Sequence, residues 1–118
     1  MIYQQMLKIL HKLLQVEVVA DNASIKKLPA MHLNELKVED NYDTVLVQYQ
    51  LSVYAESEVE MREIFSKLQA TNAFEMLEAD VRSICTFRTL GTLKMDYKNH
   101  LFQGVKDIEL QIIRTRVA

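Results

Sequence analysis

Cysteine, proline, glycine and tryptophan are all scarce in this chain of 118 residues, which has one cysteine, one proline, two glycines and no tryptophan. A single cysteine, Cys85, excludes an internal disulfide bond and cannot by itself form a thiolate metal site, and this usage suits a reducing compartment. We interpret Cys85 as a small apolar residue of a strand and not as a reactive thiol. The two glycines, Gly91 and Gly104, cannot form a phosphate-binding loop.

Neither sign of charge dominates, because 14 Lys and Arg residues face 16 Asp and Glu residues. The chain therefore has no overall field that would draw it to nucleic acid or to anionic lipid. Basic and aromatic residues near the C-terminal end invite comparison with a nucleic-acid-binding sheet, but the Arg/Lys-Gly-aromatic signature is absent and acidic residues intervene. We expect a mixed, solvated sheet face there, or contact with another subunit. The residues compared are Arg82, Phe87, Arg88, Lys94, Tyr97, Lys98, Phe102 and Lys106, with Asp96, Asp107 and Glu109 among them.

No residue pattern indicates catalysis or a bound cofactor. The three histidines, His11, His32 and His100, lack the three- or four-residue spacing that would place two of them on one metal ion. Ser52 and Ser83 lack the setting of a nucleophile elbow. An acidic cluster is best explained by the favourable interaction of negative charge with a helix N-terminus, and it consists of Glu56, Glu58, Glu60 and Glu63. The sequence predicts no catalytic, metal or cofactor site and a protein that is not an enzyme.

The first 14 residues place Ile2, Met6, Ile9, Leu10 and Leu13 on one face of a helix. Polar residues interrupt this segment, which is too short and too polar for a membrane span and lacks the order of a signal peptide. We expect a cytosolic amphipathic helix. A helix lying on a membrane surface is the alternative, which the two lysines among its polar positions support only weakly.

The clearest structural signal lies between residues 44 and 70. Apolar residues first alternate with polar ones, as in a strand with one buried face, at Val45, Val47, Tyr49, Leu51 and Val53. The period then becomes helical at Met61, Ile64, Phe65 and Leu68. Ser57 and Glu60 form a reciprocal capping pattern, which predicts a helix from about residue 58 to residue 71, with Asn72 as its left-handed stop.

Weaker signals complete the order of elements. We expect a short strand at residues 16–19, a loop at 20–27, and an extended segment at 30–39 that follows Pro29. The hydrophobic pattern of this segment changes phase between residues 33 and 36, which indicates a bulge or a bend. That segment and the strand at 44–55 should form an antiparallel hairpin. Residues 82–90 and 93–97 should form a second hairpin that turns near Gly91. The last strand carries Ile108, Leu110 and Ile112 on one side, and Ile113 is expected to lie under another element.

The sequence therefore predicts one α+β domain over residues 1–118, in the order helix, strands, helix, strands. Its sheet should be antiparallel, with both helices packed on one face.

Three segments resemble the small neck and tail-completion proteins of long-tailed bacteriophages, especially the tail terminators. They are MIYQQMLKILHKLL, VLVQYQLSVYAESEVEMREIFSKLQ and KDIELQIIR. The resemblance implies a non-enzymatic virion protein that assembles with itself into a ring, commonly a hexamer. Such a ring closes the tail tube and meets the head connector in the neck of the virion, after assembly in the host cytoplasm. It implies no small-molecule substrate, no specific nucleic acid and no membrane.

Residues 98–104 are expected to form a loop that contacts another subunit or the neck. We expect Leu101 and Phe102 to be exposed in this loop, between polar residues that include Lys98 and His100. Packing of the pair back onto its own domain is the alternative.

Two other functional classes stay open. A head-tail joining or tail-assembly adaptor would share the fold and differ in its docking partner. A host ligand-binding or regulatory module would hold a small molecule between sheet and helices, near Tyr49 or Phe65.

Overall fold

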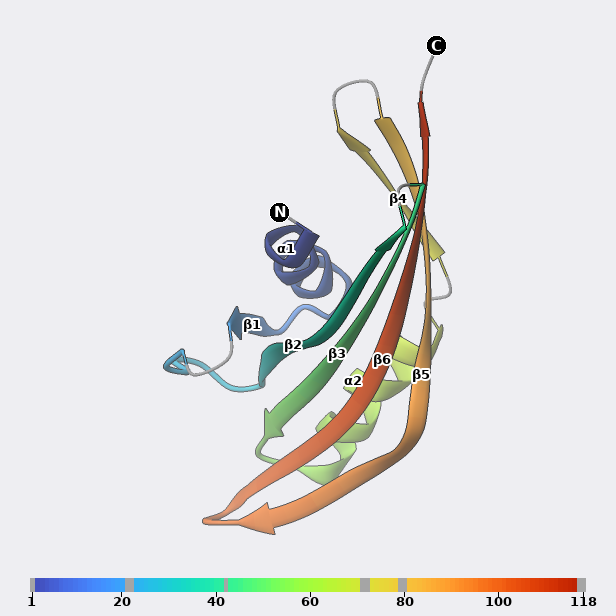
Figure 1. Cartoon of the computed structure of the whole chain (residues 1–118). Helices are drawn as coiled ribbons and strands as arrows, with labels where there is room; N and C mark the ends of the chain where they lie inside the picture. Colours follow the sequence, from blue (N-terminus) through green and yellow to red (C-terminus); the bar gives the residue numbers. More distant parts are fainter. Residues whose placement is uncertain (1, 21–22, 42, 71–72, 79–80, 117–118) are drawn as a thin grey trace.

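The computed structural model describes residues 2–20, 23–41, 43–70, 73–78 and 81–116, and it confirms the α+β class. One helix and three strands are followed by a second helix and three further strands (Figure 1). None of the described helices is long and apolar enough to cross a membrane. The elements are α1 (Ile2–Leu14), β1 (Glu17–Ala20), β2 (Ala30–Asn41), β3 (Thr44–Ala55), α2 (Glu58–Ala70), β4 (Ala73–Glu78), β5 (Val81–Lys98) and β6 (Leu101–Arg116).

The strands form one sheet in the order β1-β2-β3-β6-β5-β4. The sheet is mixed, so the expectation of a fully antiparallel sheet is wrong: β1 lies parallel to β2, while every other neighbouring pair is antiparallel. The segment between Ala20 and Ala30 carries the chain back to the end of the sheet where β1 began. A connection that returns in this way produces a parallel pair instead of a hairpin.

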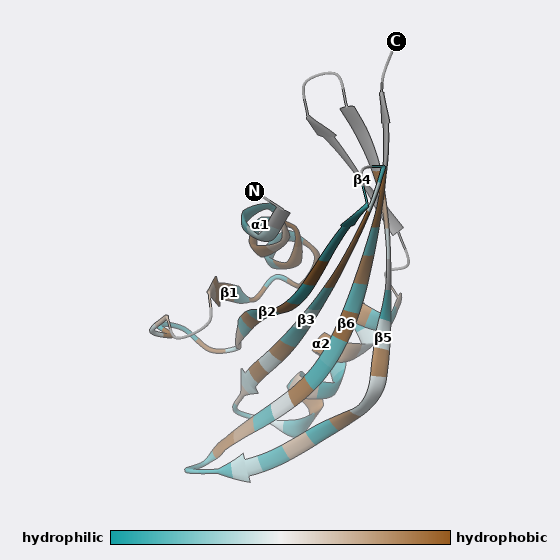
Figure 2. Cartoon of the chain, viewed as in Figure 1, coloured by the Kyte–Doolittle hydropathy of each residue, from teal (hydrophilic) through white to brown (hydrophobic). Residues whose placement is uncertain are grey.

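Both helices cover the same face of the sheet. Along β3, buried and partly buried residues alternate without exception, as predicted, and Figure 2 shows the corresponding bands of hydropathy. The Tyr3 ring of α1 lies 6.3 Å from the ring of Tyr49, which is on the buried side of β3. On the same side, Val53 pairs with Gly104 of β6, and Met61 of α2 packs over that glycine. Directly opposed residues of a sheet share a face, so α1 and α2 lie on one side and leave the other side open.

The start of α2 follows its sequence signal. The Glu60 backbone N–H donates a hydrogen bond of 3.1 Å to the Ser57 hydroxyl, as predicted for the cap. The predicted core stripe of Met61, Ile64, Phe65 and Leu68 is buried. The helix ends at Ala70, and the predicted stop at Asn72 lies outside the described residues.

The stripe of α1 matches the prediction only in part. Met6 and Leu10 are buried as predicted, and Leu14 is buried as well, whereas Ile9 is partly buried and Leu13 is 38% exposed. The side chain of Ile2 lies outside what the structure describes. The Tyr3 hydroxyl donates a hydrogen bond of 2.6 Å to the Leu33 carbonyl and so ties α1 to β2.

The predicted β2–β3 hairpin and the irregularity in β2 are both confirmed. The register shifts between Glu35 and Lys37, and the additional residue, Leu36, is 48% exposed. An additional residue on one strand bends it and increases its twist, which is the usual consequence of a bulge.

The predicted turn at Gly91 is wrong, because β5 continues through it as one strand of 18 residues. Gly91 has a φ of 68° and lies where the register of β5 against β6 shifts, between Leu90 and Lys94. A glycine with positive φ serves a strand bulge as well as it serves a hairpin turn. The true neighbour preceding β5 is β4, a strand that the sequence did not reveal; it pairs with residues 81–86.

The expected loop at 98–104 is also wrong. The chain turns at Asn99 and His100 alone, with φ angles of 55° and 60°, and β6 begins at Leu101. Two consecutive positive φ angles are typical of the tight two-residue turn that joins twisted antiparallel strands. Gly104 is therefore a buried strand residue, and Ile113 is 43% exposed instead of being covered by another element.

Candidate functional site

The histidine side chains of the helix and of β2 are held by local hydrogen bonds. His11 Nδ1 lies 2.7 Å from the Val16 carbonyl oxygen. His32 is placed between the Ala23 carbonyl oxygen at 2.8 Å and the Tyr54 hydroxyl at 3.2 Å. Within the described ranges, no group of three His, Cys, Asp or Glu residues is arranged to hold a metal ion. The contacts of these two histidines therefore serve to fix the loop and the sheet around them.

Two ionisable groups lie inside the core. Cys85 is buried in β5, as predicted, and desolvation raises the pKa of its thiol to about 11, so it is protonated at neutral pH. Burial also raises the pKa of Tyr49, with smaller contributions from Glu35, Tyr3 and Cys85. The Tyr49 hydroxyl has no hydrogen-bond partner among the described residues. Tyr49 is thus a core residue, and Phe65, the other residue expected near a small molecule, is 9% exposed.

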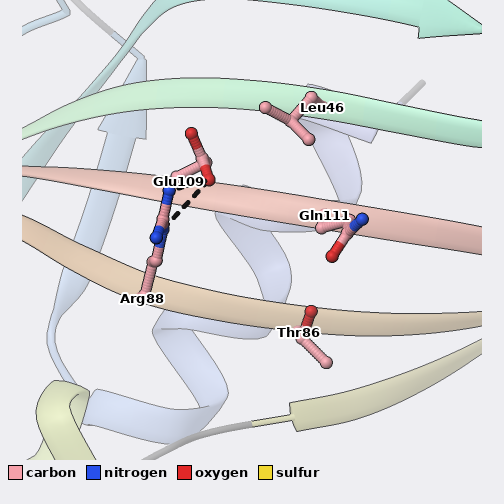
Figure 3. Close-up of a pocket in the computed structure, with 5 residues that line it drawn as sticks. All are labelled: Leu46, Thr86, Arg88, Glu109 and Gln111. Carbon is pink, nitrogen blue, oxygen red and sulfur yellow. Dashed lines mark hydrogen bonds and ion pairs between the residues drawn. The ribbon is translucent and has the colours of Figure 1, made fainter.

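The open face of the sheet carries a hollow of about 480 Å³ that spans β3, β5 and β6 (Figure 3). Arg88 Nε donates a hydrogen bond of 3.0 Å to one Glu109 carboxylate oxygen, and a terminal nitrogen of the same guanidinium forms an ion pair with that oxygen at 2.9 Å. This ion pair neutralises the guanidinium, and Figure 3 shows it to one side of the other lining residues. The remaining lining residues are Leu46, Thr86 and Gln111.

The other basic residues do not form one patch. Lys106 reaches toward the bulge of β5, where its ammonium group donates a hydrogen bond of 3.0 Å to the Gly91 carbonyl oxygen. Lys94 and Lys98 lie on β5 with Asp96 between them, so their charges are interrupted along the strand. This arrangement agrees with the expected mixed surface.

At each of the two lateral edges of the sheet, a long strand segment has no neighbour among the described strands. β1 pairs only with the first four residues of β2, which leaves residues 34–41 open on that side. β4 pairs only with residues 81–86 of β5, which leaves residues 87–98 open on the other side. Unpaired strand edges present rows of N–H and C=O groups that can bind another strand.

The two edge segments differ in charge. Residues 34–41 of β2 contain three acidic residues and one basic residue, whereas residues 87–98 of β5 contain three basic residues and one acidic residue. Each segment also exposes large apolar side chains, with Leu36 at 48% and Val38 at 49% on β2 and Tyr97 at 55% on β5. The edges therefore combine open backbone groups, exposed apolar area and complementary charge.

The four residues predicted to make partner contacts do lie together, at the tip of the β5–β6 hairpin. Lys98 ends β5, His100 is in the turn, and Leu101 and Phe102 begin β6. Leu101 and Phe102 are partly buried, and the Phe102 ring lies 4.5 Å from the ring of Tyr97. The expectation that Leu101 and Phe102 are exposed on a loop is wrong, because strand pairing places Phe102 opposite Ala55, on the helix side of the sheet. Their role in assembly stays a prediction.

The two edges could not be predicted from the sequence. A sheet edge is a property of strand order and of strand length, and neither β2 nor β5 carries a local signal that its short neighbour covers only part of it. Neither a comparison with models of known protein families nor a search of curated proteins finds a match to this chain.

Proposed function

We propose that this protein is a structural, ring-forming subunit of virion assembly, a tail terminator that caps the tail tube of a long-tailed bacteriophage and joins it to the head connector. The observation that carries the proposal is the pair of open edges on opposite sides of one sheet, at residues 34–41 and 87–98. A ring of identical subunits closes both edges at once, which is the usual way that a heterologous interface satisfies every copy. The resemblance of the helix, the strand-to-helix passage and the closing strand to tail-completion proteins supplies the setting.

The core supports a role as a rigid subunit. Helix residues Met61 and Phe65 pack on Gly104, and the alternating face of β3 is buried along its whole length. Closely packed interiors resist deformation, so contacts made at the edges are held at fixed positions. A subunit that must meet two neighbours and a tube end benefits from such fixed positions.

Electron microscopy of the purified protein, alone and mixed with tail tubes that lack their terminator, tests the proposal. We expect a closed annulus, either free or at the end of the tube. A third sample contains head connectors, and binding of the annulus to the connector without any binding to the tube would support a head-tail joining adaptor instead. Strictly monomeric behaviour in all three samples, measured in parallel by light scattering, would refute the ring.

A further inference from the structure

We propose that neighbouring copies of this chain join edge to edge, with residues 35–41 of β2 in one copy antiparallel to residues 92–98 of β5 in the next copy. This interface rests on the proposed ring and names the surfaces that form it. Within one subunit β2 and β5 already run in opposite directions, because three successive antiparallel pairings separate them. When a second copy stands beside the first as its neighbour in a ring, the β5 edge of one copy therefore meets the β2 edge of the other as an antiparallel pair.

Charge selects one register for this pair. When Lys37 lies opposite Asp96, Glu39 lies opposite Lys94, and all four side chains are on the open face of the sheet. A shift of two residues, the smallest that keeps the faces matched, places Lys37 opposite Lys94 in one direction and opposite Lys98 in the other. Opposite charges directly across a strand pair are favourable and like charges are not. Lys37 and Glu39 already form an ion pair of 2.7 Å within β2, so the junction extends it into a network of four charges.

The same register matches apolar residues on the helix side of the sheet. Val38 falls opposite Met95, and Leu36, the unpaired residue of the β2 bulge, comes level with Tyr97. Leu36, Val38 and Tyr97 are each about half exposed in the single chain, and Met95 packs against the core. Contact across the junction removes apolar surface from water on both edges, which is the main favourable contribution to such an interface.

The register also leaves room for the outer strands. Residues 30–33 of β2, which pair with β1, would face positions 100–103 of the next copy, beyond the end of β5 at Lys98. Residues 81–86 of β5, which pair with β4, would face positions 47–52, beyond the end of β2 at Asn41. Neither β1 nor β4 therefore stands between the two edges.

The offset between the edges is compatible with closure. Val38 of β2 is level with Val47 of β3 and Leu110 of β6, whereas Met95 of β5 is level with Gly104, which lies six residues from Leu110. Each junction thus shifts the strands by about 20 Å along the strand direction. The four strands of one copy span about 19 Å across the sheet, perpendicular to that shift. The resulting inclination of about 45° is close to the range in which sheets close on themselves.

Pairing of each edge with its own kind is less favourable. A junction of β2 with β2 joins two acidic segments, and a junction of β5 with β5 joins two basic segments. Either one also leaves the other edge of both copies open. The β2–β5 junction balances the charge of the two segments and closes both edges with a single type of contact.

Disulfide trapping tests the interface and its register. Two single variants, Glu39→Cys and Lys94→Cys, are purified separately, mixed and oxidised, with the buried Cys85 retained in both. Directly opposed residues have Cα atoms about 4.5–5.5 Å apart, within the range for a disulfide. We expect a cross-linked dimer in the mixture and none from either variant alone. In the register control, Lys98→Cys replaces Lys94→Cys, because an offset of four residues adds about 13 Å to the distance between the two cysteines. In the second control, Val59→Cys on the exposed side of α2 measures cross-linking by random collision.

A charge exchange gives a second measurement. Glu39→Lys or Lys94→Glu alone should weaken self-association about 10-fold, and combining both changes in one chain should restore most of the loss. The control is Glu63→Lys, an exposed acidic residue of α2 away from both edges, which should leave association unchanged.

The outcomes separate the interface from the function. Cross-linking that occurs only in the mixture of the Glu39→Cys and Lys94→Cys variants supports the proposal. Cross-linking within one variant, or preferentially with Lys98→Cys, overturns the pairing or its register. An annulus in the microscope with no cross-link in any mixture overturns the interface and leaves the ring intact. Absence of both annulus and cross-link overturns the interface together with the proposed function.

Discussion

Replacing Gly104 with alanine should destabilise the protein through the contact between α2 and β6. A Cβ atom at this position would lie 2.7 Å from Met61 Sδ, 2.9 Å from Phe65 Cε2 and 3.2 Å from Leu93 Cδ1. Two of these distances are shorter than real Cβ atoms show, so the helix or its side chains must move. Inserting one methyl group into a packed interior costs about 1–3 kcal/mol. Alanine also lowers the conformational entropy of the unfolded chain, which stabilises the folded state by about 0.4–1 kcal/mol. We therefore expect the free energy of unfolding to fall by about 1–2 kcal/mol.

Urea unfolding followed by circular dichroism measures this loss as a lower midpoint with an unchanged slope. Because crowding causes this loss of stability, shortening the crowded Met61 side chain should recover it. Met61→Ala alone should cost about 2–5 kcal/mol because it leaves a cavity, and the double variant should be more stable than the sum of the two losses by about 1–2 kcal/mol. Losses that add to within about 0.5 kcal/mol would refute the crowding explanation. Gly91→Ala is the contrasting case, because no atom lies within 4 Å of a Cβ atom placed at this residue. Its cost of about 1 kcal/mol would come from the φ of 68°. Met61→Ala should therefore leave that cost unchanged.

The further predictions concern the helix cap and the core. Ser57→Ala should lower the free energy of unfolding by about 1 kcal/mol, because it removes the acceptor of the Glu60 N–H. The control is Ser66→Ala, at an exposed position of the same helix, which should change the free energy of unfolding by less than about 0.5 kcal/mol. Equal effects of the two variants would contradict the cap. Tyr49→Phe should leave thermal stability unchanged or raise it, because the buried hydroxyl has no partner among the described residues, and a clear loss would mean that the hydroxyl is hydrogen-bonded. The thiol of Cys85 should react with a maleimide far more slowly in the folded chain than in urea, and rapid reaction when folded would contradict its burial. Because the thiol pKa rises from 9.0 to about 11 on folding, stability should fall as the pH rises through that interval, and Cys85→Ala should remove this part of the slope.

Local signals predicted the elements whose stability is decided locally. The period-two pattern of β3, the Ser57 cap and the stripe of α2 each involve residues within one or two turns or one strand face. The bulge in β2 was also visible as a phase change before Leu36. These features could be predicted because the same few residues carry both the pattern and its physical cause.

Features that depend on distant partners were missed. Gly91 offers positive φ, which suits a turn and a bulge equally, and the choice was made by the pairing of β5 with β6 on both sides of the glycine. The parallel placement of β1 depends on where the segment after Ala20 returns. The edges follow from the order of six strands, so no window of sequence contains them.

Both edges carry devices that limit indiscriminate pairing. β2 is bulged between Glu35 and Lys37, β5 is bulged between Leu90 and Lys94, and charged side chains stand on both open segments. Bulges and edge charges protect a sheet from unspecific aggregation. Here the charges alternate in sign along each edge, at Lys37 and Glu39 on β2 and at Lys94, Asp96 and Lys98 on β5.

A uniform row of lysines would repel every strand, whereas alternating signs repel most registers and favour the few in which opposite charges meet. The two edges therefore do more than avoid aggregation: their charge order distinguishes one neighbour and one register from the alternatives. A protein that functioned as a monomer would need only the repulsion. The alternation of sign along two edges of opposite net charge fits the two fixed neighbours that we propose for each subunit.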